Sequence, residues 1–183
     1  NEIEIKEMPS ITSLSIIEKT ESNSYLAVAS NQYPVIYIFN EEKQVVSRLI
    51  SHTMGVTCLN SNVFKLFSGS IDRTARIWNL NDDVTMTFFD AHEQTITAIE
   101  TGFYFDQFIL FTGLKDNLVQ CWSVTNKKFL FDIQFPKDGT PIKIVFMSGK
   151  NQVYGDFARL MIISEVFEQN MLKRYHTQFF EFI

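Results

Sequence analysis

Short apolar runs separated by polar or small residues recur along the chain, and they predict strands rather than helices. The clearest set lies between residues 56 and 89, where the four runs are Val56–Leu59, Phe64–Ser68, Thr74–Trp78 and Thr85–Phe89. Each run has only four or five residues, and the links between them contain Asp, Asn and small residues, which favour tight turns. The pattern therefore predicts a sheet of four short antiparallel strands.

The order of residue types in this segment occurs twice. The first copy runs from His52 to Trp78 and the second from His92 to Trp122. Each copy contains a small residue followed by Gly and, three residues after that Gly, an aspartate, which is Asp72 in the first copy and Asp116 in the second. Self-similarity at a fixed period is the signature of a repeat architecture. We therefore expect each copy to build the same structural unit.

The second copy is longer than the first. The two histidines are 40 residues apart but the two tryptophans are 44 apart. The additional residues fall around Phe103–Gln107, and we expect them to form a longer loop.

Weaker copies flank these two. The preceding one has apolar runs at residues 14–17, 25–30, 35–39 and 45–49. The following one has runs at 141–146, 160–164 and 178–182, with no fourth run after them. Between the last two runs Phe167, Met171 and Tyr175 are spaced by four, which is consistent with one short amphipathic helix.

The two strong copies resemble repeats of the WD-repeat β-propeller family, whose pattern is a histidine, a strand, a small-Gly-x-x-Asp turn, a strand and a tryptophan. The family's Gly-His pair is replaced by Ser51-His52 and Ala91-His92, and the Asp after Trp by Asn79 and Ser123. The resemblance implies an all-β fold of propeller blades, each a four-stranded antiparallel sheet. After a lead-in segment at 1–10, about four blades of a partial ring are expected at residues 11–50, 52–90, 92–135 and 140–183.

The resemblance also implies a buried hydrogen-bond network in each strong copy. In the first, Asp72 would accept from His52, His52 would bond the hydroxyl of Ser68, and Ser68 would accept from the indole of Trp78. The second set would be His92, Thr112, Asp116 and Trp122. Ser68 is preferred to Ser70 because its counterpart in the second copy, Thr112, also has a hydroxyl.

A catalytic interpretation of the same residues is less favourable. A Ser-His-Asp triad needs an exposed, activated hydroxyl, and a set that occurs twice at one period fits a structural role better than one active site. The histidines and cysteines lack close metal-ligand spacing. We expect neither a catalytic residue nor a bound metal or cofactor, and we expect the protein not to be an enzyme.

Composition narrows the class of partner. The 183 residues include 16 Lys and Arg against 21 Asp and Glu, which gives a formal net charge of -5. This charge disfavours nucleic acid, and the apolar runs are too short to span a membrane. Cys58 and Cys121 lie inside apolar runs and no glycosylation sequon occurs, so we expect reduced thiols and an intracellular protein, cytoplasmic or nuclear.

The number of blades has a consequence for assembly. Propellers of the family usually have more blades than about four, and an open arc would expose a strand edge and an apolar face. We expect the rest of the propeller or a second chain to close the ring. The chain begins with Asn1 rather than Met, which favours the former.

Function is expected on the propeller loops, because loops on a rigid scaffold carry most binding residues. The candidate partner-binding residues are Tyr33, Met54, Arg73, Glu93, Gln94 and Lys115. The leading hypothesis is a non-enzymatic scaffold that assembles other proteins or peptide segments. The alternative is the substrate-recruiting propeller of a larger enzyme chain, such as a ubiquitin ligase component or a kinase.

Overall fold

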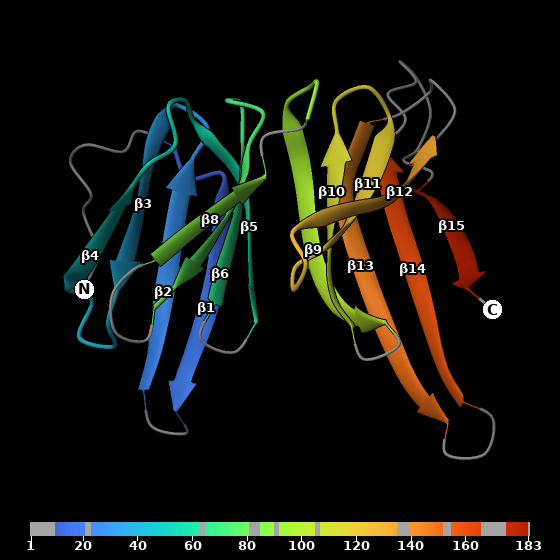
Figure 1. Ribbon diagram of the computed structural model, residues 1–183. Coiled ribbons are helices and arrows are strands. Elements are labelled where there is room, and N and C mark those ends of the chain that lie inside the picture. The colour runs from blue at the N-terminus through green and yellow to red at the C-terminus, as the bar shows by residue number, and fades with distance from the viewer. Residues whose placement is uncertain are drawn as a thin grey trace. The chain divides into compact units, whose positions relative to one another are not determined.

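The chain folds into antiparallel β-sheets (Figure 1). In this computed structural model the described residues are 10–20, 23–62, 65–80, 85–89, 92–104, 107–134, 140–151, 155–165 and 175–182. Within them the strands form four sheets, three of four strands and one of three, and no helix is present. The expected all-β fold of small antiparallel sheets is confirmed.

The first two sheets belong to one compact unit, residues 1–96. In each sheet the strands are paired in the order in which they follow one another along the chain. The first sheet consists of β1 (Ser13–Thr20), β2 (Asn23–Ser30), β3 (Tyr33–Phe39) and β4 (Val45–Ile50). The second consists of β5 (Val56–Asn62), β6 (Lys65–Ser70), β7 (Ala75–Asn79) and β8 (Thr85–Phe89).

The other two sheets belong to a second unit, residues 97–183. The third sheet consists of β9 (Ile96–Tyr104), β10 (Gln107–Leu114), β11 (Leu118–Ser123) and β12 (Lys128–Gln134). The fourth consists of β13 (Thr140–Asn151), β14 (Gly155–Glu165) and β15 (Tyr175–Phe182).

One expectation about the third sheet is wrong. Phe103, Tyr104 and Gln107 do not lie in a longer loop, because β9 continues to Tyr104 and β10 begins at Gln107, and residues 105–106 lie outside the described residues. They lengthen the two strands instead, which agrees with the strand preference of the aromatic residues there. The helix suggested by Phe167, Met171 and Tyr175 lies mostly outside the described residues, and Tyr175 itself is the first residue of β15.

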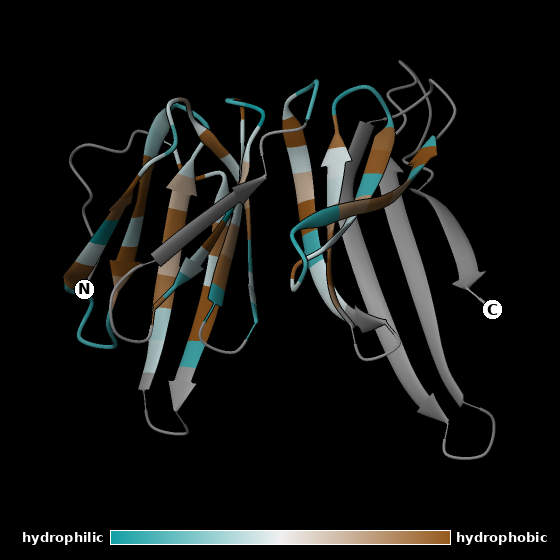
Figure 2. Cartoon of the chain, viewed as in Figure 1, coloured by the Kyte–Doolittle hydropathy of each residue, from teal (hydrophilic) through white to brown (hydrophobic). Residues whose placement is uncertain are grey.

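The core of the first unit lies between its two sheets, where β5 packs against β1, β2 and β3. Ile36, Val56 and Leu66 are fully buried there. Complete burial of such a side chain contributes roughly 1.5–3 kcal/mol. In Figure 2 the hydrophobic bands lie on the strands, whereas the connecting turns are mostly hydrophilic. Face-to-face packing of apolar sheets therefore holds this unit together.

Serine side chains bind the two sheets of this unit along β1 and β5. Ser13 Oγ accepts the Leu59 N–H at 2.9 Å, and Ser15 Oγ donates to Ser61 Oγ at 2.9 Å. These bonds join the first strand of one sheet to the first strand of the other. They satisfy polar groups that sheet packing removes from water.

The first sheet is also apolar on the face that does not meet the second sheet. Its centre is a buried cluster of Val28, Tyr37 and Phe39. Leu14 and Ile16 share this face because they pair with Val28 and Leu26, and Ile50 shares it because it pairs with Val35. Leu14, Ile16 and Ile50 are 57%, 64% and 69% exposed. We call these three side chains the outer face of the first sheet.

In the second unit β10 is the most deeply buried strand of the third sheet. Leu110 and Phe111 have almost no exposed surface, and β10 packs against β13 of the fourth sheet. On the neighbouring strand Val119 and Trp122 are also buried. The third sheet therefore contributes to its unit's core through its two central strands.

Candidate functional site

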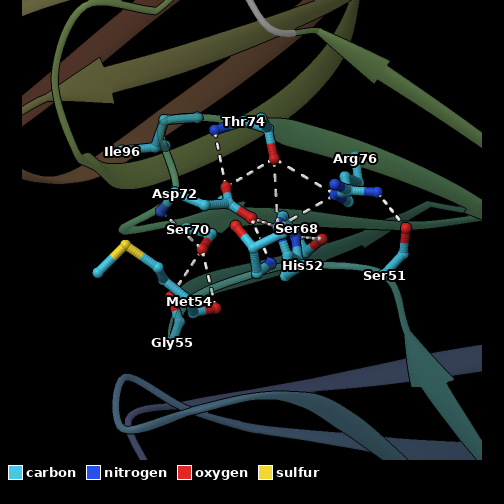
Figure 3. Close-up of polar contacts among 12 residues, drawn as sticks. Ser51, His52, Met54, Gly55, Ser68, Ser70, Asp72, Thr74, Arg76 and Ile96 are labelled. Atoms are coloured by element: carbon cyan, nitrogen blue, oxygen red, sulfur yellow. Dashed lines mark hydrogen bonds and ion pairs between the residues drawn. The ribbon is translucent and has the colours of Figure 1, made fainter.

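A chain of hydrogen bonds enters the second sheet, and Figure 3 shows its members His52, Ser68 and Asp72. His52 Nδ1 lies 2.8 Å from Asp72 Oδ2, and His52 Nε2 lies 2.8 Å from Ser68 Oγ. Ser68 Oγ also accepts the indole N–H of Trp78 at 2.9 Å. The structure thus brings together the four residues that the sequence grouped in the first copy, and we call them the Asp72–Trp78 chain.

The Asp72 carboxylate is the anchor of this chain. Its Oδ2 accepts from His52 Nδ1 and from the Thr53 N–H at 3.0 Å. Its Oδ1 accepts the Thr74 N–H at 2.9 Å and the Thr74 hydroxyl at 2.6 Å. A carboxylate offers about four acceptor sites, so these four bonds use its capacity fully. The side chain is only 4% exposed, yet its charge is satisfied.

The carboxylate also determines where the imidazole proton lies. A carboxylate can only accept, so His52 Nδ1 carries a hydrogen and donates it to Asp72. His52 Nε2 is then an acceptor and takes the Ser68 O–H, which leaves the Ser68 oxygen to accept from Trp78. Every member of the chain therefore has a consistent role with a neutral imidazole.

Burial and hydrogen bonding shift the pKa values of the two titratable members. Burial lowers the pKa of His52 below 6.5, although Asp72 works against this shift. For Asp72 burial alone would raise the pKa, but hydrogen bonds from His52, Thr74 and the Thr53 N–H outweigh it and hold the pKa well below its ordinary value. At neutral pH the fold therefore contains an ionised Asp72 and an uncharged His52.

A buried arginine lies next to the Asp72–Trp78 chain of hydrogen bonds. Arg76 on β7 donates to the Ser51 hydroxyl, and its Nε lies 3.3 Å from Thr74 Oγ1. That Nε also lies 3.2 Å from His52 Nδ1, but Nδ1 already carries a hydrogen, so the Thr74 hydroxyl is the acceptor. Burial lowers the pKa of Arg76 and the nearby Asp72 charge partly restores it. The guanidinium thus compensates the buried carboxylate.

The order Asp72, His52, Ser68 has the hydrogen-bond pattern of a nucleophilic triad, but the serine cannot act as one. Ser68 is completely buried, and its oxygen is occupied by the Trp78 indole. An attacking hydroxyl must reach a substrate and must have a lone pair directed toward it. The arrangement therefore serves structure, not acyl transfer.

A second set of bonds fastens the turn that contains Asp72 to the loop that contains His52. Ser70 Oγ donates to the Gly55 carbonyl at 2.8 Å and accepts the Asp72 N–H at 3.1 Å. The Ile71 N–H donates to the same carbonyl at 3.0 Å. The loop between β4 and β5 is thereby fixed to the turn between β6 and β7.

At Gly55 the loop between β4 and β5 also packs closely against a third turn. A Cβ on Gly55 would lie 1.7 Å from the carbonyl oxygen of Asn31, so only glycine fits against the turn between β2 and β3. Three exposed side chains lie in or next to the three adjoining turns, namely Tyr33, Met54 and Arg73, of which Tyr33 is the first residue of β3. We call these three residues the rim. Arg73 has a φ of 67°, a left-handed conformation that favours Gly or Asn, and Asn117 has it at the corresponding turn.

The other expected site residues are distributed as follows. In the third sheet Trp122 Nε1 donates to Thr112 Oγ1 at 3.1 Å, as Trp78 does to Ser68. Asp116 is exposed, unlike Asp72, and the bond expected from His92 to Asp116 through Nδ1 is not formed, because that nitrogen has no hydrogen-bond partner among the described residues. The remaining candidate partner-binding residues are exposed and are Glu93, Gln94 and Lys115.

The site also contains residues that the sequence did not assign to the network. Thr74 and Ser70 hold the Asp72 turn, and Thr57 Oγ1 donates to the Gly69 carbonyl at 2.9 Å. Thr97 Oγ1 repeats the last bond with the Gly113 carbonyl at 3.2 Å. The two threonines could have been found from the repeat, because each follows the histidine of its copy by five residues.

The described residues contain neither a metal-binding cluster nor a membrane-spanning helix. Among them no group of three His, Cys, Asp or Glu side chains could hold a metal ion. Cys58 and Cys121 are free thiols, and burial raises the pKa of each to about 12, so they are protonated at neutral pH. No helix in the described part of the chain is long and apolar enough to cross a membrane.

We predict that Asp72→Asn lowers the free energy of unfolding by about 1–3 kcal/mol, because an amide cannot accept all four bonds and leaves buried donors unpaired. Asp116→Asn is the matched control, and a change at this exposed side chain should stay within about 0.5 kcal/mol. Urea unfolding of the two variants measures both. Equal losses would show that the anchoring role does not belong to Asp72.

We predict that stability falls as the pH is lowered. Both pKa values are lower in the fold than in the unfolded chain, so the unfolded chain binds protons first. The loss begins as the pH falls through about 6.5 for His52 and continues below about 3.9 for Asp72. Urea titrations between pH 7.5 and 4.5 should show a steeper decline for the parent than for His52→Gln. A parent whose stability rises over this range would contradict the assignment.

Comparisons with known proteins agree with this architecture. Residues 43–79 and 83–123 match the family model described as WD domain, G-beta repeat. Each match covers the outer strand of one sheet and the first three strands of the next. No curated protein matches the chain. Among solved structures, the computationally designed Ika4 protein, a propeller, is similar over 91% of both chains at 18% identity and a TM-score of 0.61. Residues 43–79 and 83–123 therefore match WD repeats, and the antiparallel sheets of the described residues are of the kind that forms propeller blades.

Proposed function

We propose that this protein is a non-enzymatic scaffold that binds other proteins or peptide segments through the rim of Tyr33, Met54 and Arg73. WD40 repeats generally mediate protein–protein interaction, which supports the class of function. The observation that carries the proposal is the way the three turns are held. The exposed side chains project from backbone that the Asp72 turn and Gly55 fix in place.

The chemistry of the rim suits binding. Aromatic, methionine and arginine side chains are enriched at protein interfaces, and each can cover a large contact area. The backbone beneath them is already ordered, so less conformational entropy is lost when a partner binds.

The outer face of the first sheet supports a second part of the proposal. The opposite face of that sheet is covered by β5 of the second sheet, whereas Leu14, Ile16 and Ile50 are more than half exposed. Exposed apolar surface of this kind is characteristic of an interface. We infer that a further blade, from the rest of the propeller or from a second chain, covers this face.

We predict that the combined variant Tyr33→Ser, Met54→Ser and Arg73→Asn loses the partners of the parent protein while it keeps the fold. Arg73→Asn should not destabilise, because Asn117 already adopts the same φ region. Affinity purification with each protein, quantified by mass spectrometry, measures the partners, and thermal unfolding measures the fold. The matched control is Lys43→Asn with Lys127→Asn, which changes exposed residues of other turns. An unchanged set of partners in the combined variant would contradict the role of the rim.

We predict that the isolated chain associates with itself as its concentration rises, because the outer face is left uncovered. Leu14→Ser with Ile16→Ser should raise the concentration needed for association by about tenfold or more, since about 1.4 kcal/mol of lost apolar contact is a factor of ten. Ile11→Ser is the control, because Ile11 is similarly exposed but precedes β1. Light scattering measures the mass. A monomer at every concentration would contradict an uncovered interface.

A further inference from the structure

The outer strand of the first sheet contains a β-bulge. On β4 Ser47 is opposite Ile38 of β3, but the next pair joins Val45 to Phe39. β4 therefore advances by two residues where β3 advances by one, and Val46 is the extra, unpaired residue. β4 is the last strand of its sheet, so its other edge is not paired within the sheet.

The outer strand of the third sheet has the same irregularity at the same place. Phe131 of β12 is opposite Cys121 of β11, and the next pair joins Phe129 to Trp122, so Leu130 is the extra residue. The two positions correspond, because Phe39 and Trp122 occupy the same place in their sheets. Each of them is also opposite a leucine of the second strand, Leu26 or Leu110.

The second sheet shows that the repeat does not require a bulge there. On β8 Thr87 is opposite Ile77 and Met86 is opposite Trp78, with no shift between the pairs. The bulge is therefore a separate feature of β4 and β12 and not a consequence of four-stranded blades.

The turn before each bulged strand is also alike. Lys43 and Lys127 have φ values of 64° and 54°, and each lies two residues before the first bulge residue, Val45 or Phe129. The first turn is closed by Asn40, whose side chain accepts the Gln44 N–H at 2.8 Å. The same combination of a left-handed lysine and a bulge thus occurs in both hairpins.

Both bulges contain exposed apolar side chains. Val45 and Val46 are 43% and 49% exposed, and Phe129 and Leu130 are 47% and 42% exposed. β-Branched and aromatic residues on an outer strand favour pairing with a strand of another chain. A bulge opposes such pairing, because it adds local twist and interrupts the regular alternation of backbone hydrogen bonds.

We propose that the bulges at Val46 and Leu130 close the outer edges of the first and third sheets to strand addition by another chain. An incoming extended strand can form regular hydrogen bonds with the edge on one side of the bulge only. On the other side, the additional residue of the edge strand shifts the register between the two strands. The apolar side chains stay exposed, but the backbone beside them is not a continuous template. This property is independent of the rim and of the outer face.

Deletion of Val46 tests the proposal directly. The deletion leaves the pairs Ile38 with Ser47 and Phe39 with Val45 intact, so the sheet can keep its present partners while β4 becomes regular. The test is made in the Leu14→Ser, Ile16→Ser background, in which association through the outer face is suppressed. We expect association at about tenfold lower concentration than in the background protein, since one or two additional backbone hydrogen bonds correspond to such a factor.

Two variants and one peptide keep this test decisive. Val46→Thr retains the bulge and should leave the mass by light scattering unchanged, and deletion of Leu130 should repeat the effect in the third sheet. A deletion variant that is folded by circular dichroism but stays monomeric overturns the proposal. If neither deletion variant folds, a peptide with the sequence of Val45–Ile50 is added to the parent protein. Protection of the amides of β4 from hydrogen exchange by this peptide overturns the proposal, and unchanged exchange supports it.

Discussion

The turns of the second sheet depend on one buried carboxylate. Asp72 takes four hydrogen bonds from three residues, and through His52 and Ser68 it is connected to the indole of Trp78 in the sheet interior. A charge removed from water is tolerated only when it is fully hydrogen-bonded. Because the donors come from the loop between β4 and β5 and from the turn before β7, satisfying the charge fixes the two relative to one another. The exposed side chains of the rim derive their positions from this constraint.

The first sheet meets the same packing requirement without polar groups. The pair of Val28 and Tyr37 in the first sheet corresponds to the pair of Ser68 and Arg76 in the second. Phe39 of the first sheet likewise corresponds to Trp78 of the second. The resulting cluster of Val28, Tyr37 and Phe39 is buried. The Arg48 guanidinium lies 5.5 Å from the centre of the Tyr37 ring, within the range of a cation–π contact. Apolar packing and a satisfied polar network are thus two solutions for one position of the repeat.

The sequence predicted most of the fold from periodicity, and the members of the Asp72–Trp78 chain from the resemblance to WD repeats. Strand runs repeat with the histidine, the aspartate and the tryptophan, and a repeated set of polar residues inside apolar runs must pair internally. It did not predict that Asp72 is buried whereas Asp116 is exposed, although the two share the same motif. Burial depends on which side chains lie over the turn, and those come from distant parts of the chain.

Other features depend on pairing register and were not accessible to the same reasoning. A bulge at Val46 is visible only when the partners of Ser47 and Val45 are known. The burial of Arg76 contradicts the usual exposure of arginine and follows from its position beside Asp72. The lengthening of β9 to Tyr104 replaced an expected loop, because residue counts alone do not distinguish a longer strand from a longer turn.

The most direct test of the buried network is the nitrogen-15 and proton NMR spectrum of the His52 ring at neutral pH. The account predicts a neutral imidazole whose hydrogen lies on Nδ1, with a slowly exchanging, strongly deshielded proton that is lost in Asp72→Asn. A ring that is protonated on both nitrogens would reverse the bond between His52 Nε2 and Ser68, and one that carries its hydrogen on Nε2 alone could not donate to Asp72, so either result would contradict the account.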